Sequence, residues 1–414
     1  MTAECGPARG AVRMTVIMCV AESFSMAAFA TYTTLLPLLQ REWALTNSQA
    51  GLIGGIAFAG YMTAVPVLTA LTDRIDSRRI YLGACGLSAL GAAGFALFAG
   101  GFWSALVFQF IIGAGLGGTY MPGLKALTDH LEGRAQARAT AFYAACFGIG
   151  SSTSILVSGW LGHAYGWRSA FVCGALSPLI AAALVNLMMP RGRTREQKSS
   201  TALLDFRPVL SNKTTRYYIL GYAVHNFELF AQRAWMVAFL VFSATLQPSG
   251  TVAVLSAATL AAIINLCGPL MSVTGNELAL RYGRQRIIFV FMCASGLVAC
   301  GFGFAAGLPS AIVFALMCLH YGLMLGDSAA LTAGAIGSAP ADQRGAILAV
   351  YSFLGFSAAL TGPLAFGVVL DLAGGNRHVI AWGLAYASIG IFGALAPLAR
   401  WMHNNNNRIS KVQS

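Results

Sequence analysis

Long apolar segments are the feature of this sequence that most restricts its fold. A helix that crosses a bilayer needs roughly 20 mostly apolar residues. Twelve such segments can be read in the 414 residues. They cover residues 14–39, 49–71, 80–100, 103–125, 139–162, 169–190, 217–242, 252–274, 287–307, 310–334, 345–370 and 379–400. The sequence therefore predicts an all-α membrane protein with twelve transmembrane helices.

Composition supports this fold class. Only 10% of the residues are charged, against about 25% in soluble proteins, and 57% are hydrophobic. Soluble domains of this length would lack the polar residues needed to cover their surfaces. The 47 glycines fit membrane helices that pack closely through small residues. We see none of the alternating apolar and polar strands of a membrane β-barrel.

The chain has a net charge of +12, and the positions of its basic residues follow the predicted membrane topology. If the N-terminus is internal, 22 of the 26 Lys and Arg residues lie on the cytoplasmic side. Arg41, Arg168 and Arg377 lie on the other side, and Arg233 lies within a span. This is the positive-inside pattern of a multi-pass protein of the cell inner membrane, with both termini in the cytoplasm. The basic residues therefore need no nucleic-acid partner.

A polar stretch and a repeat divide the chain. Residues 191–216 form the longest polar stretch, with six predicted spans on each side. LTDRIDSRR (71–79) follows the second span, and LALRYGRQR (278–286) follows the eighth. Arg74 and Arg281 of these stretches are 207 residues apart, and Arg138 and Arg344, in the loops before spans 5 and 11, are 206 apart. Two matches at nearly equal spacing indicate a duplicated unit. We expect an N-terminal bundle (1–190), a cytoplasmic linker (191–216), a C-terminal bundle (217–400) and a cytoplasmic tail (401–414).

These loops resemble the motif of the major facilitator superfamily. The first copy matches at Leu71, Asp73, Arg74 and Arg78, and the second keeps Gly283 but has Leu280 in place of the Asp. GWRSAF (166–171) is also typical of that family. The resemblance implies two six-helix bundles around a central cavity, alternating access and a monomer. It also implies a conformational latch in the loops, formed by Asp73, Arg74, Arg78, Arg281, Gly283 and Arg284.

The overall sequence resembles the nitrate- and cyanate-permease-like branch of that family. Nitrate porters carry an Arg in span 2 and another in span 8, and neither span has one here. The sequence therefore gives no support to a nitrate role.

Three carboxylic residues fall well inside predicted spans. Glu22, Glu228 and Asp327 lie in spans 1, 7 and 10. Glu22 and Glu228 are separated by the repeat spacing of 206 residues, so they occupy equivalent places. In the implied fold these spans line the cavity, where ionisable residues usually have functional roles. The three acids are candidate proton-coupling groups; the alternative is static ion pairing that fixes helix packing.

Span 7 carries further polar residues. His225, Glu228 and Gln232 share one face at helical spacing. Arg233 lies about 140° around the helix from Glu228, which disfavours a direct bond between them. Arg233 shares a face with Asn226 and is a candidate substrate-binding group, because an Arg fork suits a carboxylate. The alternative is a pair with Glu22 or Asp327.

Other candidates remain open between two interpretations. His225 is a candidate proton relay and His320, in span 10, a candidate substrate contact, or both are neutral packing residues. Gln109 stands in span 4, where many family members carry a buried Arg linked to proton coupling. Tyr120, like Gln109, is a candidate for lining the cavity. The serines of SSTS (151–154) either bind substrate or lie at a helix contact.

No enzyme site is visible. The sequence lacks a phosphate-binding loop, a cluster with metal-ligand spacing and a nucleophile constellation. The nine cysteines are scattered and indicate free thiols. We predict no cofactor and no metal. The expected function is proton-coupled symport of a small organic solute, such as a carboxylate, with protons and the lipid bilayer as the other partners. The alternative is a proton-driven exporter of a metabolite or a cationic drug.

Overall fold

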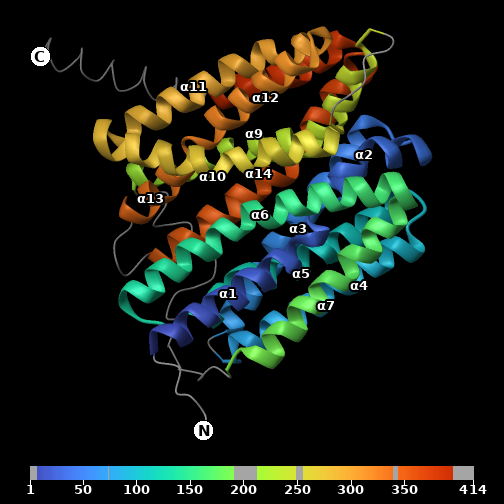
Figure 1. The fold of residues 1–414 in the computed structure, drawn as a ribbon. Helices are drawn as coiled ribbons and strands as arrows, with labels where there is room; N and C mark the ends of the chain where they lie inside the picture. The colour runs from blue at the N-terminus through green and yellow to red at the C-terminus, as the bar shows by residue number, and fades with distance from the viewer. Residues whose placement is uncertain (1–6, 73, 191–211, 249–254, 339–343, 395–414) are drawn as a thin grey trace, which may run out of the picture. The chain divides into compact units, whose positions relative to one another are not determined.

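The computed structural model describes residues 7–72, 74–190, 212–248, 255–338 and 344–394, and these residues are almost entirely helical (Figure 1). The labelled elements are α1 (Pro7–Ser25), η1 (Met26–Ala28), α2 (Thr31–Glu42), α3 (Asn47–Leu71), α4 (Ser77–Phe98), α5 (Phe102–Thr128), α6 (Gly133–Tyr165), α7 (Trp167–Met188), α9 (Lys213–Thr245), α10 (Ala257–Tyr282), α11 (Arg284–Phe302), η2 (Gly303–Gly307), α12 (Ser310–Leu325), α13 (Ser328–Ser338) and α14 (Arg344–Leu372). A further helix covers Val379–Ala394.

Among the described residues, eleven helical segments are long and apolar enough to cross a membrane. They coincide with the first eleven predicted spans, and Val379–Ala394 is the described part of the twelfth. The prediction of an all-α membrane protein is confirmed. Several helices extend past the apolar segments that predicted them. For example, α9 starts at Lys213, because Asn212 caps it by accepting hydrogen bonds from the backbone of Thr214 and Thr215.

The first span is interrupted, which hydropathy did not predict. The short 3-10 turn η1 separates α1 from α2. A serine of α6 binds the backbone at this interruption: the hydroxyl of Ser154 donates to the carbonyl of Ala27 at 2.6 Å and accepts from the amide of Ala30 at 3.1 Å. Backbone groups freed inside a membrane need such partners. Ser154 therefore stabilises the break.

The tenth span is also interrupted, between α12 and α13, at Gly326 and Asp327. The backbone here approaches α10 very closely. A Cβ added at Gly275 would lie only 1.7 Å from the carbonyl oxygen of Gly326. Small residues at both positions allow this contact, and Asp327 lies immediately before α13.

The chain forms two compact units. Unit 1 comprises Met1–Leu45, Ile56–Ser200 and Ala261–Leu266, and unit 2 comprises Thr46–Gly55, Thr201–Leu260 and Cys267–Ser414. The predicted bundle boundaries at 190 and 217 stay a prediction. Residues 191–211 of the predicted linker, and the predicted tail (401–414), lie outside the described residues.

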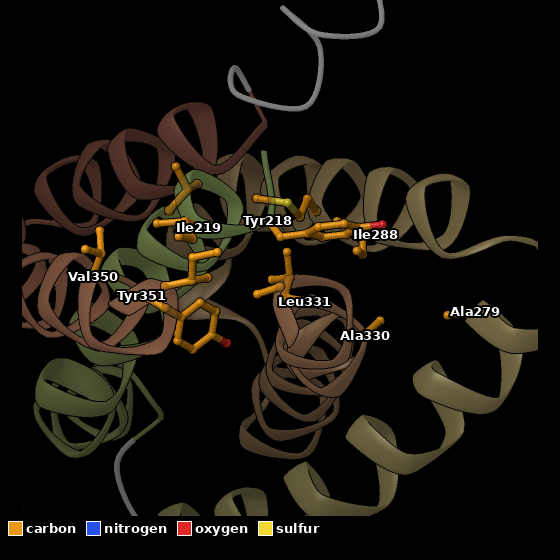
Figure 2. Packing of buried hydrophobic residues seen from close by; sticks show 12 residues of the cluster. Tyr218, Ile219, Ala279, Ile288, Ala330, Leu331, Val350 and Tyr351 are labelled. Atoms are coloured by element: carbon orange, nitrogen blue, oxygen red, sulfur yellow. The ribbon is translucent and has the colours of Figure 1, made fainter. Parts of the chain in front are cut away.

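Each unit has an apolar cluster that borders buried polar residues. In unit 1, residues such as Met18, Ala21 and Tyr143 pack together from α1 and α6 with parts of α4, α5 and α7. In unit 2, Tyr218, Ile219, Leu331 and Tyr351 belong to a cluster that joins α9, α13 and α14 with residues of α10 and α11 (Figure 2). The clusters fix the helices that carry the carboxylic residues considered next.

Candidate functional site

Glu22 lies on α1 and is fully buried within unit 1. Its Oε2 atom accepts hydrogen bonds from the hydroxyl of Tyr143, at 2.8 Å, and from that of Ser25, at 3.1 Å. Its Oε1 atom is buried without a hydrogen-bond partner. One oxygen is thus held by two donors, and the other is available to carry a proton.

Glu228 lies on α9 and is buried within unit 2, with 3% of its surface exposed. Its Oε1 atom lies 3.1 Å from Nε2 of His320 on α12. Its Oε2 atom accepts a hydrogen bond from the hydroxyl of Ser295 on α11, at 3.2 Å. Gly393 makes room for the carboxyl group, since a Cβ there would lie 2.9 Å from Oε2. Three other helices therefore surround this acid.

Asp327 forms the second acid–imidazole pair of unit 2. Its Oδ1 atom lies 2.7 Å from Nδ1 of His225 on α9, and both side chains are almost completely buried. The ring of Tyr222 stacks on the His225 ring with centroids 6.2 Å apart. His225 and Glu228, one turn apart on α9, thus each contact a partner that belongs to span 10.

These pairs can hold and transfer protons. When a carboxyl group and an imidazole are in direct contact, one proton can lie on either partner. A carboxylic acid can donate the proton, and a neutral imidazole can accept it. Two such pairs lie within unit 2, and Glu22 lies in unit 1 with a single unpartnered oxygen.

Arg233 is held by aromatic groups on its own helix and on α12. Its Nε atom donates a hydrogen bond to the hydroxyl of Tyr321 at 2.9 Å. Its guanidinium carbon lies 5.5 Å from the ring centroid of Phe230 and 5.9 Å from that of Tyr321. The side chain is half-buried. These contacts orient the guanidinium through Nε.

The predicted amide candidates are buried. Gln109 on α5 and Asn226 on α9 each have a side-chain nitrogen without a hydrogen-bond partner. Gln232 is fully buried, and neither its amide nitrogen nor its amide oxygen has a partner. Tyr120 is half-buried in unit 1, where its ring lies 5.7 Å from that of Tyr143. A substrate role for these residues stays a prediction.

The serines of α6 contact other helices. Asn265, a residue that sequence reasoning did not single out, donates from Nδ2 to the hydroxyls of Ser151, at 2.7 Å, and Ser152, at 2.8 Å. With Ser154 at the break of the first span, three of the four residues of SSTS lie at helix contacts. This arrangement matches the packing interpretation of that stretch.

The proposed latch residues have mixed environments. Arg78 donates to the backbone carbonyl and, at 2.9 Å, to the side-chain oxygen of Asn186. Arg74 and Arg281 are exposed, and Arg284 is half-buried. Gly283 joins α10 to α11 with φ +96°, a conformation that favours glycine. Asp73 lies outside the described residues, and the latch role stays a prediction.

The partners of the charged residues were not foreseen. Tyr143, Ser295 and Tyr321 supply hydroxyl groups to Glu22, Glu228 and Arg233, respectively. Hydroxyl and aromatic residues are common at helix contacts, and each of these comes from a different helix than its partner. Sequence spacing carries no signal for such contacts.

Comparison with known proteins decides the family. A family model described as "Major Facilitator Superfamily" matches residues 18–363. The chain belongs to the Major Facilitator Superfamily. The eleven long apolar helices among the described residues, together with this membership, show a multi-pass membrane protein with the superfamily fold. The resemblance inferred from the loop motifs is confirmed.

The curated relatives are named as transporters, and their sequence identity to this chain is low. The niacin transporter NiaP of Acinetobacter baylyi is 28% identical over 34% of this chain and 32% of its own length. The 4-hydroxybenzoate transporter PcaK of the same organism is 27% identical over 37% of this chain and 34% of its own length. A probable 4-methylmuconolactone transporter of Cupriavidus pinatubonensis is 27% identical over 66% of this chain and 63% of its own length. The chain thus matches between about one third and just under two thirds of the length of each of these relatives.

Solved structures of the superfamily share the fold. The nucleoside transporter NupG has a TM-score of 0.75 at 12% identity, with 94% of this chain and 98% of that chain covered. A D-xylose–proton symporter has a TM-score of 0.74 at 16% identity, with 94% and 97% covered. At these identities, the likeness shows that the chain shares the fold of these proteins.

The contacts of Glu22 predict the effect of one substitution. Tyr143→Phe removes one of the two hydroxyls that donate to the buried Oε2 atom and leaves Ser25 as the other donor. The loss of one such hydrogen bond costs about 0.5–1.5 kcal/mol. We expect a lower melting temperature of the purified protein in a thermal unfolding measurement. Tyr386→Phe is the matched control, because its hydroxyl is buried without a partner and its removal should leave stability unchanged or higher. Equal destabilisation of both variants would contradict the role given to Tyr143.

Proposed function

We propose that the chain takes up a small organic anion, a carboxylate, together with protons, across the inner membrane by alternating access. The observation that carries the proposal is the arrangement within unit 2. A half-buried guanidinium, Arg233, lies on the same helix as two residues of buried acid–imidazole pairs, His225 and Glu228.

The proton component rests on burial and contact. A charged side chain within the membrane region is costly, so such residues are usually neutralised by a partner or a proton. Glu228 and Asp327 each have an imidazole within hydrogen-bond distance. Proton binding and release at these pairs would change the charge of unit 2 during the cycle. Glu22, with its unpartnered Oε1, is the corresponding group of unit 1.

The substrate class rests on Arg233 and on the relatives. Its Nε donates to Tyr321, and a guanidinium is the side chain whose planar donors match a planar carboxylate. Niacin and 4-hydroxybenzoate, named in two curated relatives, are both aromatic carboxylates.

The orientation in the membrane rests on the charge distribution. The excess of Lys and Arg in alternate loops supports cytoplasmic termini and an inner-membrane location. In that orientation, the latch residues Arg74, Arg78, Arg281 and Arg284 would lie in cytoplasmic loops. We expect the protein to function as a monomer.

Substitution of Arg233 tests the substrate class. The probes are 4-hydroxybenzoate and niacin, added to the purified protein in a thermal-shift measurement. A ligand that binds the native state raises the melting temperature by mass action, so we expect a rise with a carboxylate probe and its loss in Arg233→Lys, which keeps the charge but not the fork. Arg286→Gln, which removes an exposed Arg of α11, is the control and should keep the rise. A rise that persists in Arg233→Lys would contradict the substrate-binding role of Arg233, and the absence of a rise with either carboxylate would contradict the proposed substrate class.

Substitution of Glu228 tests the coupling. Glu228→Gln removes the titratable group while keeping the side-chain shape, so we expect loss of uphill accumulation of labelled 4-hydroxybenzoate in proteoliposomes, with exchange retained. Glu277→Gln, an exposed carboxyl group on α10, is the matched control and should accumulate the probe as the unmodified protein does. Unaltered uphill uptake by folded Glu228→Gln protein would show that this residue does not couple transport to protons.

A further inference from the structure

Two cysteines of unit 1 lie at a close helix contact near Glu22. Cys19 is on α1 and Cys146 is on α6, and each thiol lies within interaction range of the other. Cys146 is 8% exposed and Cys19 is half-buried. Neither thiol has a part in the proposed transport mechanism.

The spacing of contacts between these helices explains why the thiols meet. Further along the same pair of segments, Ser154 binds the carbonyl of Ala27, and the hydroxyl of Thr31 lies 2.9 Å from that of Ser158. Both contacts join residues that are 127 positions apart. Residues four apart lie on one face of a helix, so the next contact in this series joins Ser23 to Gly150, and the one after it joins Cys19 to Cys146.

The contact at Ser23 and Gly150 shows how closely the backbones approach. A Cβ added at Gly150 would lie 3.2 Å from Cα of Ser23 and 2.9 Å from Cβ of Met26. The absence of a side chain at Gly150 lets α1 and α6 pack closely there. Cys19 and Cys146 are one turn earlier on their respective helices. Disulfides require Cα atoms about 4.4–6.8 Å apart. The three contacts at Thr31, Ala27 and Ser23 show close packing that favours such a spacing one turn earlier.

We propose that Cys19 and Cys146 are a modification site, a thiol pair that peroxides convert to a disulfide. A hydroperoxide oxidises one thiol to a sulfenic acid and is itself reduced to an alcohol, or to water in the case of hydrogen peroxide. The sulfur of the second thiol then attacks the sulfenic sulfur. The S–S bond forms, the S–O bond breaks, and the hydroxyl leaves as water with the proton of the second thiol. A dithiol reductant reverses the modification.

The disulfide would join α1 to α6 beside a functional candidate. Glu22 lies three residues after Cys19, about one turn further along α1. Tyr143, which donates to Glu22, lies three residues before Cys146 on α6. The same two helices thus carry the thiol pair and the contact that holds the carboxyl group, so the bond would fix their register at this point.

Peptide mapping of the full-length protein tests the proposal. The purified protein is treated with hydrogen peroxide, its remaining thiols are alkylated, and proteolytic fragments are identified by mass spectrometry. We expect a fragment that links Cys19 to Cys146 in most molecules and its disappearance after dithiothreitol. Linked fragments, rather than total thiols, are the measurement because Cys267 and Cys318 also lie within interaction range of each other and can form a separate link.

Two variants complete the test. In Cys19→Ser, the linked fragment should be absent while Cys146 stays open to alkylation or is oxidised without a partner. Cys300→Ser, a substitution on α11 in unit 2, is the matched control and should leave the link unchanged. If both thiols of the unsubstituted protein remain open to alkylation after peroxide treatment, or are oxidised singly without linking, the proposal is wrong.

Discussion

This structure depends on one constraint: polar groups buried among apolar helices need hydrogen-bonding partners. A helix satisfies its own backbone, so the polar groups that remain are at interruptions and on side chains. Ser154 stabilises the backbone break in the first span. Hydroxyl groups of Tyr143 and Ser295, together with the imidazoles of His225 and His320, serve the buried acids. Each of these contacts joins two helical segments, so polar satisfaction also fixes the packing inside each unit.

The two units place their acids in related settings. Glu22 and Glu228 occupy equivalent positions of the sequence repeat, and both lie beside an apolar cluster of their own unit. Their partners differ: Glu22 has two hydroxyl donors, whereas Glu228 has a histidine and one hydroxyl. The two acid–imidazole contacts of unit 2 are the geometric support for its proposed role in proton binding. The half-buried Arg233 is on the same helix, which supports a shared role for α9 in proton and substrate binding.

The sequence predicted the helices well because membrane spans leave a strong signal in hydropathy. It did not predict the interruptions at η1 or at Gly326, because apolar composition continues across both. The buried carboxylic residues stood out since charge is rare in a span, and helix geometry indicated that Arg233 and Glu228 do not bond directly. Tyr321, Ser295 and Asn265 could not be found in this way, because their contacts are with helices remote in the sequence and their residue types also serve ordinary packing.

The most direct test of the central claim is proton movement during substrate uptake. The protein is placed in proteoliposomes in weakly buffered medium, 4-hydroxybenzoate or niacin is added outside, and external pH is followed. The account predicts that the external pH rises with downhill uptake of the probe, because protons enter with the anion, and that protein-free liposomes show no such rise. Uptake of labelled probe by the protein without a change in external pH would contradict the account.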